Sequence, residues 1–78
     1  MRFRTRASEL EAEKYDGRTV PEFAKARIRG AMQGEPLTVD TDEGERQCRI
    51  GDYLILSDDG KVLVRDPSVF ETYFEPVP

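Results

Sequence analysis

The chain has 78 residues, of which 37% are apolar and 36% charged, and this predicts a single folded domain over residues 1–78 with a heavily charged surface. A core of this size excludes a deep enclosed active site and leaves a net stability of about 5 kcal/mol. One cysteine, Cys48, excludes an internal disulfide, and the absence of histidine excludes a zinc site made of cysteine and histidine. We therefore expect no cofactor, no metal and no enzymatic activity.

The two parts of the chain carry opposite charge. Residues 1–29 hold eight basic and five acidic side chains, whereas residues 30–78 hold four basic and eleven acidic ones, for a net charge of −4. This asymmetry favours ion pairs between the two parts of the chain. The alternative is that the molecule presents two faces of opposite charge to a partner. No window reaches the roughly 20 apolar residues of a membrane span, and the start MRFRTRASELEAEK lacks the apolar core of a signal peptide, so we expect a cytoplasmic protein.

Two segments before the first Asp-Gly turn have the alternation of strands. In RFRTR, Arg2, Arg4 and Arg6 alternate with Phe3 and threonine, which predicts a strand with three guanidinium groups on one face. Residues 8–15 carry good helix formers, yet their apolar and acidic side chains alternate with the period of a strand. Propensity and periodicity leave both a helix and a strand open for this second segment.

The segment TVPEFAKARIRGAMQG, residues 19–34, is predicted to be a helix. Thr19 and Glu22 match a capping box, Pro21 suits the first turn, and Gly30 or Gly34 marks the end. Helical spacing places four apolar side chains on one face: Val20, Phe23, Ala24 and Ile28.

Two hairpins follow. In the first, Leu37 and Val39 pair with a strand in which Cys48 and Ile50 share the apolar face, around a turn where Gly44 suits a left-handed conformation. In the second, YLIL and KVLV flank the turn 57–60, and their continuous apolar runs predict strands covered on both faces.

A short helix closes the chain. Asp66 is the predicted N-cap, Pro67 the first helical residue and Pro76 the stop. The whole pattern predicts an α+β fold with an antiparallel sheet of four to five strands and both helices packed on it. One core is then expected from eight side chains: Phe23, Ile28, Val39, Ile50, Ile55, Val64, Phe70 and Phe74.

The segments LEAEKYDG, GDYLI and DPSVFETYFEPV resemble a family of small bacteriophage and prophage proteins with a Pro-Gly-Asp-Tyr signature. The resemblance spans almost the whole chain and is strongest over residues 50–77. Ile50 stands here where the family has proline, and Glu13 where the family tends to be apolar. The resemblance favours a strand over residues 8–15 and implies a phage-encoded accessory protein made in a bacterial cytoplasm. It implies no catalytic residues.

The leading hypothesis is a non-enzymatic protein that binds a bacterial host or defence protein, for instance as an inhibitor. Candidate contact residues are the two aromatic residues near the C-terminus and the polar residues of the second hairpin and its entry: Asp52, Tyr53, Asp58, Asp59, Tyr73 and Phe74. The Gly51-Asp52-Tyr53 tripeptide is interpreted mainly as the turn that leads into a strand. An exposed edge at residues 2–6 would instead permit a homodimer by strand pairing.

Nucleic acid binding is the main alternative. It would use a basic stripe with aromatic neighbours: Arg2, Arg4, Arg6, Lys25, Arg27 and Arg29. The acidic net charge argues against it. A further alternative is an acidic mimic of nucleic acid, built from Asp40, Asp42, Glu43, Glu45, Asp58, Asp59 and Asp66.

Other reactive groups have simpler interpretations. Asp40, Asp42 and Gly44 resemble a calcium loop only loosely, because glycine occupies a ligand position. Cys48 is predicted to be a buried apolar residue, with no histidine to activate it. The carboxylate pairs lie in predicted turns, where solvation keeps their pKa values ordinary and denies them acid-base roles.

Overall fold

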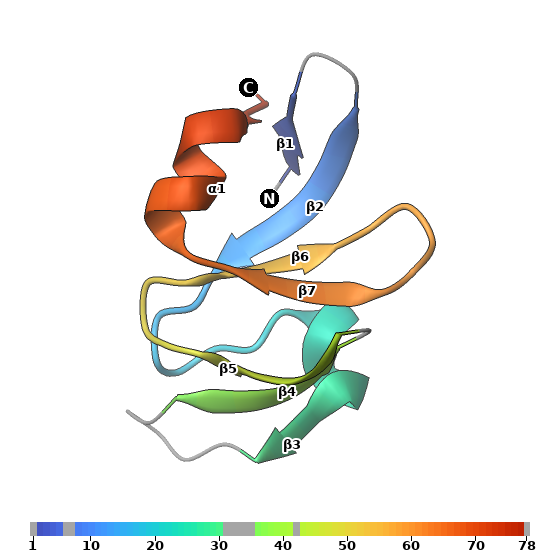
Figure 1. The fold of residues 1–78 in the computed structure, drawn as a ribbon, viewed down its shortest axis with the longest axis vertical. Coiled ribbons are helices and arrows are strands. Elements are labelled where there is room, and N and C mark those ends of the chain that lie inside the picture. The colour runs from blue at the N-terminus through green and yellow to red at the C-terminus, as the bar shows by residue number, and fades with distance from the viewer. Residues whose placement is uncertain (1, 6–7, 31–35, 42, 78) are drawn as a thin grey trace.

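The computed structural model describes residues 2–5, 8–30, 36–41 and 43–77, and Figure 1 shows their arrangement. The fold is α+β, as predicted. In chain order its elements are β1 (Arg2–Arg4), β2 (Glu9–Lys14), the 3-10 helix η1 (Glu22–Arg27), β3 (Ile28–Gly30), β4 (Leu37–Thr41), β5 (Gly44–Cys48), β6 (Tyr53–Leu56), β7 (Val62–Arg65), α1 (Pro67–Tyr73) and β8 (Glu75–Pro76).

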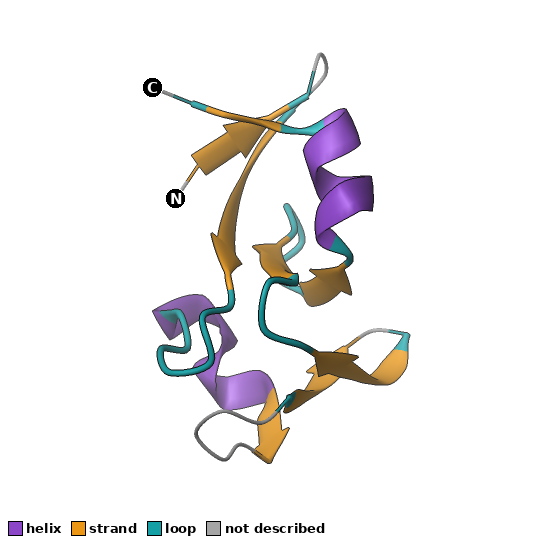
Figure 2. Ribbon diagram, turned by 90° about the vertical axis from the view of Figure 1, so that its left-hand side faces the viewer, coloured by secondary structure: helices purple, strands orange, loops and turns teal. Residues whose placement is uncertain are grey.

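The strands form two antiparallel sheets. A five-stranded sheet has the order β7-β6-β2-β1-β8, and a three-stranded sheet has the order β3-β4-β5. The expected sheet of four to five strands is therefore present, but the first hairpin, β4–β5, lies in the second sheet. Figure 2 shows α1 beside the strands of the larger sheet and η1 at the other end of the molecule.

The first two segments are both strands. In β1, Phe3 is buried while Arg2 and Arg4 point to solvent, as the alternation predicts. Residues 9–14 form β2, which settles the choice between helix and strand. β1 is not a free edge, because β8 pairs with it and the Val77 N–H donates to the Arg2 carbonyl at 3.0 Å. The prediction of an exposed edge at residues 2–6 is thus wrong for the described strand, and Arg6 lies outside the described residues.

The predicted long helix is wrong in type and extent. Asp16 Oδ1 accepts the N–H groups of Arg18 and Thr19 at 2.9 and 2.8 Å, so the chain turns there without the expected capping box. The 3-10 helix η1 covers residues 22–27 and has no side-chain cap. Residues 28–30 are extended because they pair with β4, where Ile28 lies opposite Val39. Gly34 lies outside the described residues.

Both predicted hairpins are present. Leu37 pairs with Cys48 in the first, and Gly44 has the expected positive φ of +97°. Ile55 pairs with Leu63 in the second. Ile50 is not in a strand, and its side chain is 57% exposed, because β5 ends at Cys48 and the chain then turns.

The C-terminal helix begins as predicted. The Asp66 side chain accepts the Ser68 N–H at 2.9 Å, and Pro67 is the first helical residue. The helix ends at Tyr73, before Pro76, because Phe74 is already extended and leads into β8. Neither α1 nor η1, the helices of the described ranges, has the length and apolar character needed to cross a membrane.

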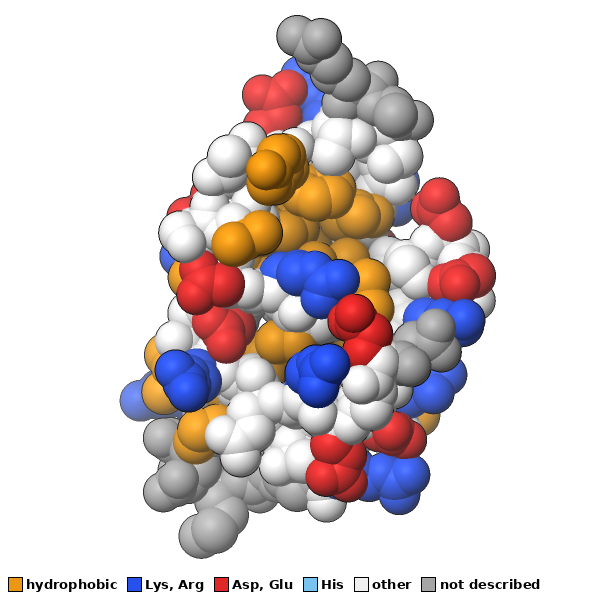
Figure 3. Space-filling model, viewed as in Figure 1, with side chains coloured by type: hydrophobic (Ala, Val, Ile, Leu, Met, Phe, Trp, Pro, Cys, Tyr) orange, Lys and Arg blue, Asp and Glu red, His pale blue; other side chains and the backbone are white. Residues whose placement is uncertain are grey.

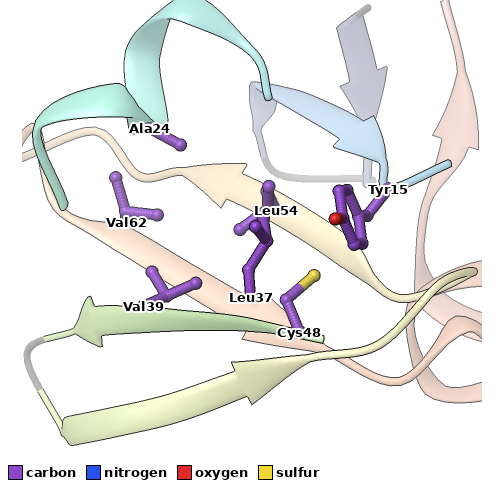
Figure 4. Close-up of a cluster of buried hydrophobic side chains, with 7 residues drawn as sticks. All are labelled: Tyr15, Ala24, Leu37, Val39, Cys48, Leu54 and Val62. Atoms are coloured by element: carbon purple, nitrogen blue, oxygen red, sulfur yellow. The ribbon is translucent and has the colours of Figure 1, made fainter. Parts of the chain in front are cut away.

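The expected single core is in fact two. One cluster lies between the sheets under η1 and is shown in Figure 4: Tyr15, Ala24, Leu37, Val39, Cys48, Leu54 and Val62. The other lies between the five-stranded sheet and α1: Phe3, Ala12, Tyr53, Ile55 and Phe70. Of the eight predicted core residues, Phe23, Ile28, Val39 and Val64 join the first cluster, and Ile55, Phe70 and Phe74 join the second. β6 supplies both clusters, because Leu54 points to one face of the sheet and its neighbours to the other.

Candidate functional site

An apolar groove lies beside α1 on the larger sheet. We call it the α1 groove; its volume is about 270 Å³. Figure 3 shows hydrophobic side chains gathered on this face, beside α1 and over the strands. The groove is lined by Leu10, Ile55, Leu63, Arg65, Val69, Phe70, Tyr73 and Phe74.

The short helix α1 carries more apolar side chains than it buries against the sheet, and the groove lies where they remain uncovered. Phe70 points into the second core and is 1% exposed. Val69 and Tyr73, one turn apart on another side of the helix, are 50% and 69% exposed. Both side chains line the groove, where a second surface can cover them.

The floor of the groove is a packed set of aromatic rings. Phe70 stacks on Tyr53 at 4.1 Å between centroids and on Phe74 at 4.7 Å, and Phe3 meets it edge to face at 4.8 Å. The Tyr53 hydroxyl donates to Glu71 Oε2 at 2.8 Å, which ties the sheet to α1. Burial, together with the Glu71 carboxylate, raises the pKa of Tyr53 to about 12. Phe70 and Phe74 line the groove, and the rings packed beneath them support its floor.

The six predicted contact residues do not form one surface. Tyr73 and Phe74 lie together at the groove, Tyr73 exposed and Phe74 half-buried. Tyr53 is buried beneath the groove. Asp58 and Asp59 lie apart at the tip of the hairpin β6–β7.

Asp52 has the structural role expected of the turn before β6. Its Oδ2 accepts the Arg49 N–H at 3.0 Å, and its carbonyl accepts the Tyr15 N–H at 2.8 Å. The Gly51 N–H donates back to the Tyr15 carbonyl at 2.8 Å. These bonds join two loops, so the interpretation of Gly51-Asp52 as a turn is confirmed.

No pattern in the sequence marks Leu10, Leu63 or Arg65 as residues of a binding site. Leu10 and Leu63 are only part-buried, and they meet at the groove because β2, β6 and β7 are neighbours in the sheet. Val69, next to the buried Phe70 on the same helix, is half exposed. The one usable signal was the excess of apolar side chains on a short helix.

The predicted basic stripe is not continuous. Arg2 and Arg4 lie on β1, whereas Lys25 and Arg27 lie on η1 at the other end of the molecule, as Figure 1 shows. Arg4 is 3.0 Å from Glu75, and Arg2 is 3.4 Å from Glu9. Lys25 is 2.9 Å from Glu22, and Arg29 of β3 is 3.0 Å from Asp40. Pairing within the molecule therefore accounts for most of the described basic stripe.

The predicted acidic set is also partly engaged within the chain. Glu43 lies 3.4 Å from Arg65, and Asp59 lies 3.5 Å from Lys61. A hydrogen bond from Ser57 holds the pKa of Asp59 below its usual range, and hydrogen bonds from Ser68 do the same for Asp66. Glu45 is exposed on β5, and Asp42 lies outside the described residues. These acids are spread over two hairpin tips and a helix cap.

Cys48 is fully buried, and burial, followed by the nearby Asp52 carboxylate, raises the pKa of its thiol to about 12. A thiol with such a pKa stays protonated and unreactive at neutral pH. In the described ranges, no group of three or more acidic or cysteine side chains is placed to hold a metal ion.

A wider hollow of about 750 Å³ lies between β2 and η1, and its rim is charged. Its acids already have partners: Glu11 is 3.7 Å from Arg2, Glu22 pairs with Lys25, and Asp16 accepts backbone N–H groups. The α1 groove is smaller but more apolar, and it is flanked by exposed large side chains. It is therefore the stronger candidate for a binding site.

Comparison with known proteins finds no matching family model, no similar curated protein and no similar solved structure. The resemblance to the phage proteins therefore rests on the quoted segments alone.

Proposed function

We propose that this chain is a non-enzymatic protein that acts by binding another protein through the α1 groove. The observation that carries the proposal is the exposure of Val69 and Tyr73 at an apolar groove. Aromatic side chains around a preformed apolar groove are typical of the centre of protein interfaces. Covering these two side chains would remove apolar surface from water, which favours association.

The partner we propose is a bacterial host or defence protein, and the chain would act in the bacterial cytoplasm as a phage-encoded accessory protein, for instance as an inhibitor. This part of the proposal rests on the likeness of GDYLI and DPSVFETYFEPV to the phage family. Val69 and Tyr73 of the α1 groove both belong to that second segment.

Nucleic acid binding is less well supported. The described arginines and lysines of the stripe lie at two ends of the molecule, and most are paired with carboxylates. A phosphate backbone would have to displace those carboxylates at each contact, in a chain of net charge −4.

The proposal is tested by affinity capture from nuclease-treated bacterial extract at moderate and high salt. Three tagged proteins are compared: the unmodified chain, Tyr73→Ala, and the control Gln47→Ala, which changes an exposed residue on β5. We expect one host protein to be retained by the unmodified chain and the control and lost with Tyr73→Ala, while all three melt alike. Retention by all three would reject the groove, and retention of only RNA or DNA from untreated extract would favour nucleic acid binding.

A further inference from the structure

We infer that the partner segment that occupies the α1 groove places a carboxylate beside a large apolar or aromatic side chain. This inference rests on the proposed function and names the chemistry of its partner. The groove supplies both halves of the recognition: an apolar floor and one charged side chain, Arg65, among the residues described as lining it.

Arg65 is placed to accept a carboxylate from outside. It is the last residue of β7, and its side chain is 41% exposed. Its Nη1 donates to the Val64 carbonyl at 2.9 Å and lies 3.4 Å from Glu43 Oε1. Within the described ranges these contacts both use Nη1, so Nε and Nη2 remain for a two-point bond with a carboxylate.

The contact with Glu43 is replaceable. Glu43 is itself about half exposed, and its oxygen lies at the long end of the range for an ion pair. Exposed pairs of this kind contribute little and are screened by salt. A partner carboxylate next to the groove would meet the guanidinium in a drier setting, where the same pairing is stronger.

The apolar half of the segment follows from the shape of the groove. The groove, with a volume of about 270 Å³, has room for one large side chain of a partner. It is too small to cover an extended apolar face. Phe70 and Phe74 stack with an interplanar angle of 7°, and Tyr73 stands beside them. An inserted ring would find aromatic partners on the floor and the wall. A cationic neighbour on the same segment would be repelled by Arg65.

Three capped tetrapeptides test the inference: acetyl-Gly-Phe-Asp-Gly-amide and its Asn and Lys analogues at the third position. Binding is followed by NMR through the backbone amides of Leu63, Val69 and Phe74. We expect the Asp peptide to bind about threefold to fivefold more tightly than the Asn peptide, and the Lys peptide to bind most weakly. The preference should disappear in Arg65→Gln and grow in Glu43→Gln.

The matched control is Arg46→Gln, which removes an exposed arginine from the other sheet and should keep the preference. Arg65→Lys keeps the charge but loses the two-point geometry, so it should retain part of the preference for the Asp peptide. This variant replaces Arg65→Gln in the test if Arg65→Gln does not fold. Equal binding of the three peptides at the groove would overturn the inference and leave the proposed function standing.

If no peptide shifts the NMR signals of the groove amides, both the inference and the proposed function are overturned. A dimer in sedimentation that Tyr73→Ala abolishes would assign the groove to a second copy of the chain and overturn the inference.

Discussion

The hydroxyl of Tyr53, buried under α1, donates a 2.8 Å hydrogen bond to Oε2 of Glu71, a carboxylate that is half exposed on the helix. Lys14 Nζ approaches the same carboxylate at 3.7 Å and lies 5.7 Å from the centre of the Tyr53 ring. One carboxylate thus joins β6, β2 and α1 beneath the groove. Together with the stack of Phe70 on Tyr53, this link fastens α1 to the sheet beside the groove.

Tyr53→Phe should therefore lower the free energy of unfolding by about 1 kcal/mol. The ring and its stack on Phe70 remain, and the Glu71 carboxylate left behind can be hydrated, so no buried polar atom is stranded. Urea unfolding measures the change, with Glu71→Gln as the comparison that keeps an acceptor for the hydroxyl. A loss of stability above about 3 kcal/mol, or no loss, would contradict the role of a single stabilising hydrogen bond between Tyr53 and Glu71.

Alkaline pH should destabilise the fold through its buried thiol and phenols. The pKa of Cys48 rises from 9.0 to about 12 on folding and that of Tyr53 from 10.0 to about 12, both mainly by burial. The unfolded chain releases these protons first, so the contribution of these two groups to the free energy of unfolding is constant below about pH 9 and falls between about pH 9 and 12. The slope reaches at most about 1.4 kcal/mol per pH unit for each group.

Cys48→Ala separates the thiol from the phenols. Its loss of stability should begin near pH 10 instead of pH 9, because the remaining groups whose pKa folding raises are tyrosines, with an ordinary value of 10.0. Urea unfolding at a series of pH values gives both onsets. The same onset in the variant and the unmodified chain would show that the thiol is not protonated and buried as the structure has it.

Phe70 and Tyr73 should respond differently to truncation although they are neighbours on one helix. Phe70→Ala removes a ring that contacts three others, and it should cost about 3 to 5 kcal/mol, most of the stability of a chain this size. Tyr73→Ala removes an exposed ring and should change stability by at most about 0.5 kcal/mol. A large loss with Tyr73→Ala would place this ring in the core and remove the groove's main anchor.

Local signals in the sequence predicted the elements that local bonds hold. The Asp66 cap and the turn at residues 57–60 involve residues close together in the chain, and both are present. The helix prediction fails at residues 28–30 because their partner is β4, a strand that starts only at Leu37. Pairing between distant segments overrides a helical pattern, and nothing within the segment itself reports that pairing.

The groove could not be predicted from the sequence for a related reason. Val69, Phe70, Tyr73 and Phe74 are all apolar at helical spacing, so the sequence does not say which of them the sheet will cover. The choice depends on the angle at which α1 lies on the sheet, where Phe70 fills the space beside Tyr53. Of the three aromatic residues predicted as contacts, Tyr73 alone is exposed, and no pattern in the sequence marks Arg65.

Gly17 should be sensitive to substitution for two separable reasons. Its φ is +87°, and a Cβ there would lie 2.8 Å from Cδ1 of Ile50, in the loop that is bonded to Tyr15. Gly60 has a similar φ of +83° but open space around it. Gly60→Ala should therefore cost only the backbone strain, about 1 to 2 kcal/mol, and Gly17→Ala should cost more.

A double-mutant cycle isolates the second reason. In an Ile50→Ala background the clash is gone, so Gly17→Ala should there cost no more than Gly60→Ala. Urea unfolding of the single and double variants measures the difference. If Gly17→Ala costs the same with and without Ile50, then Ile50 moves aside freely and the close approach of the two loops does not constrain the fold.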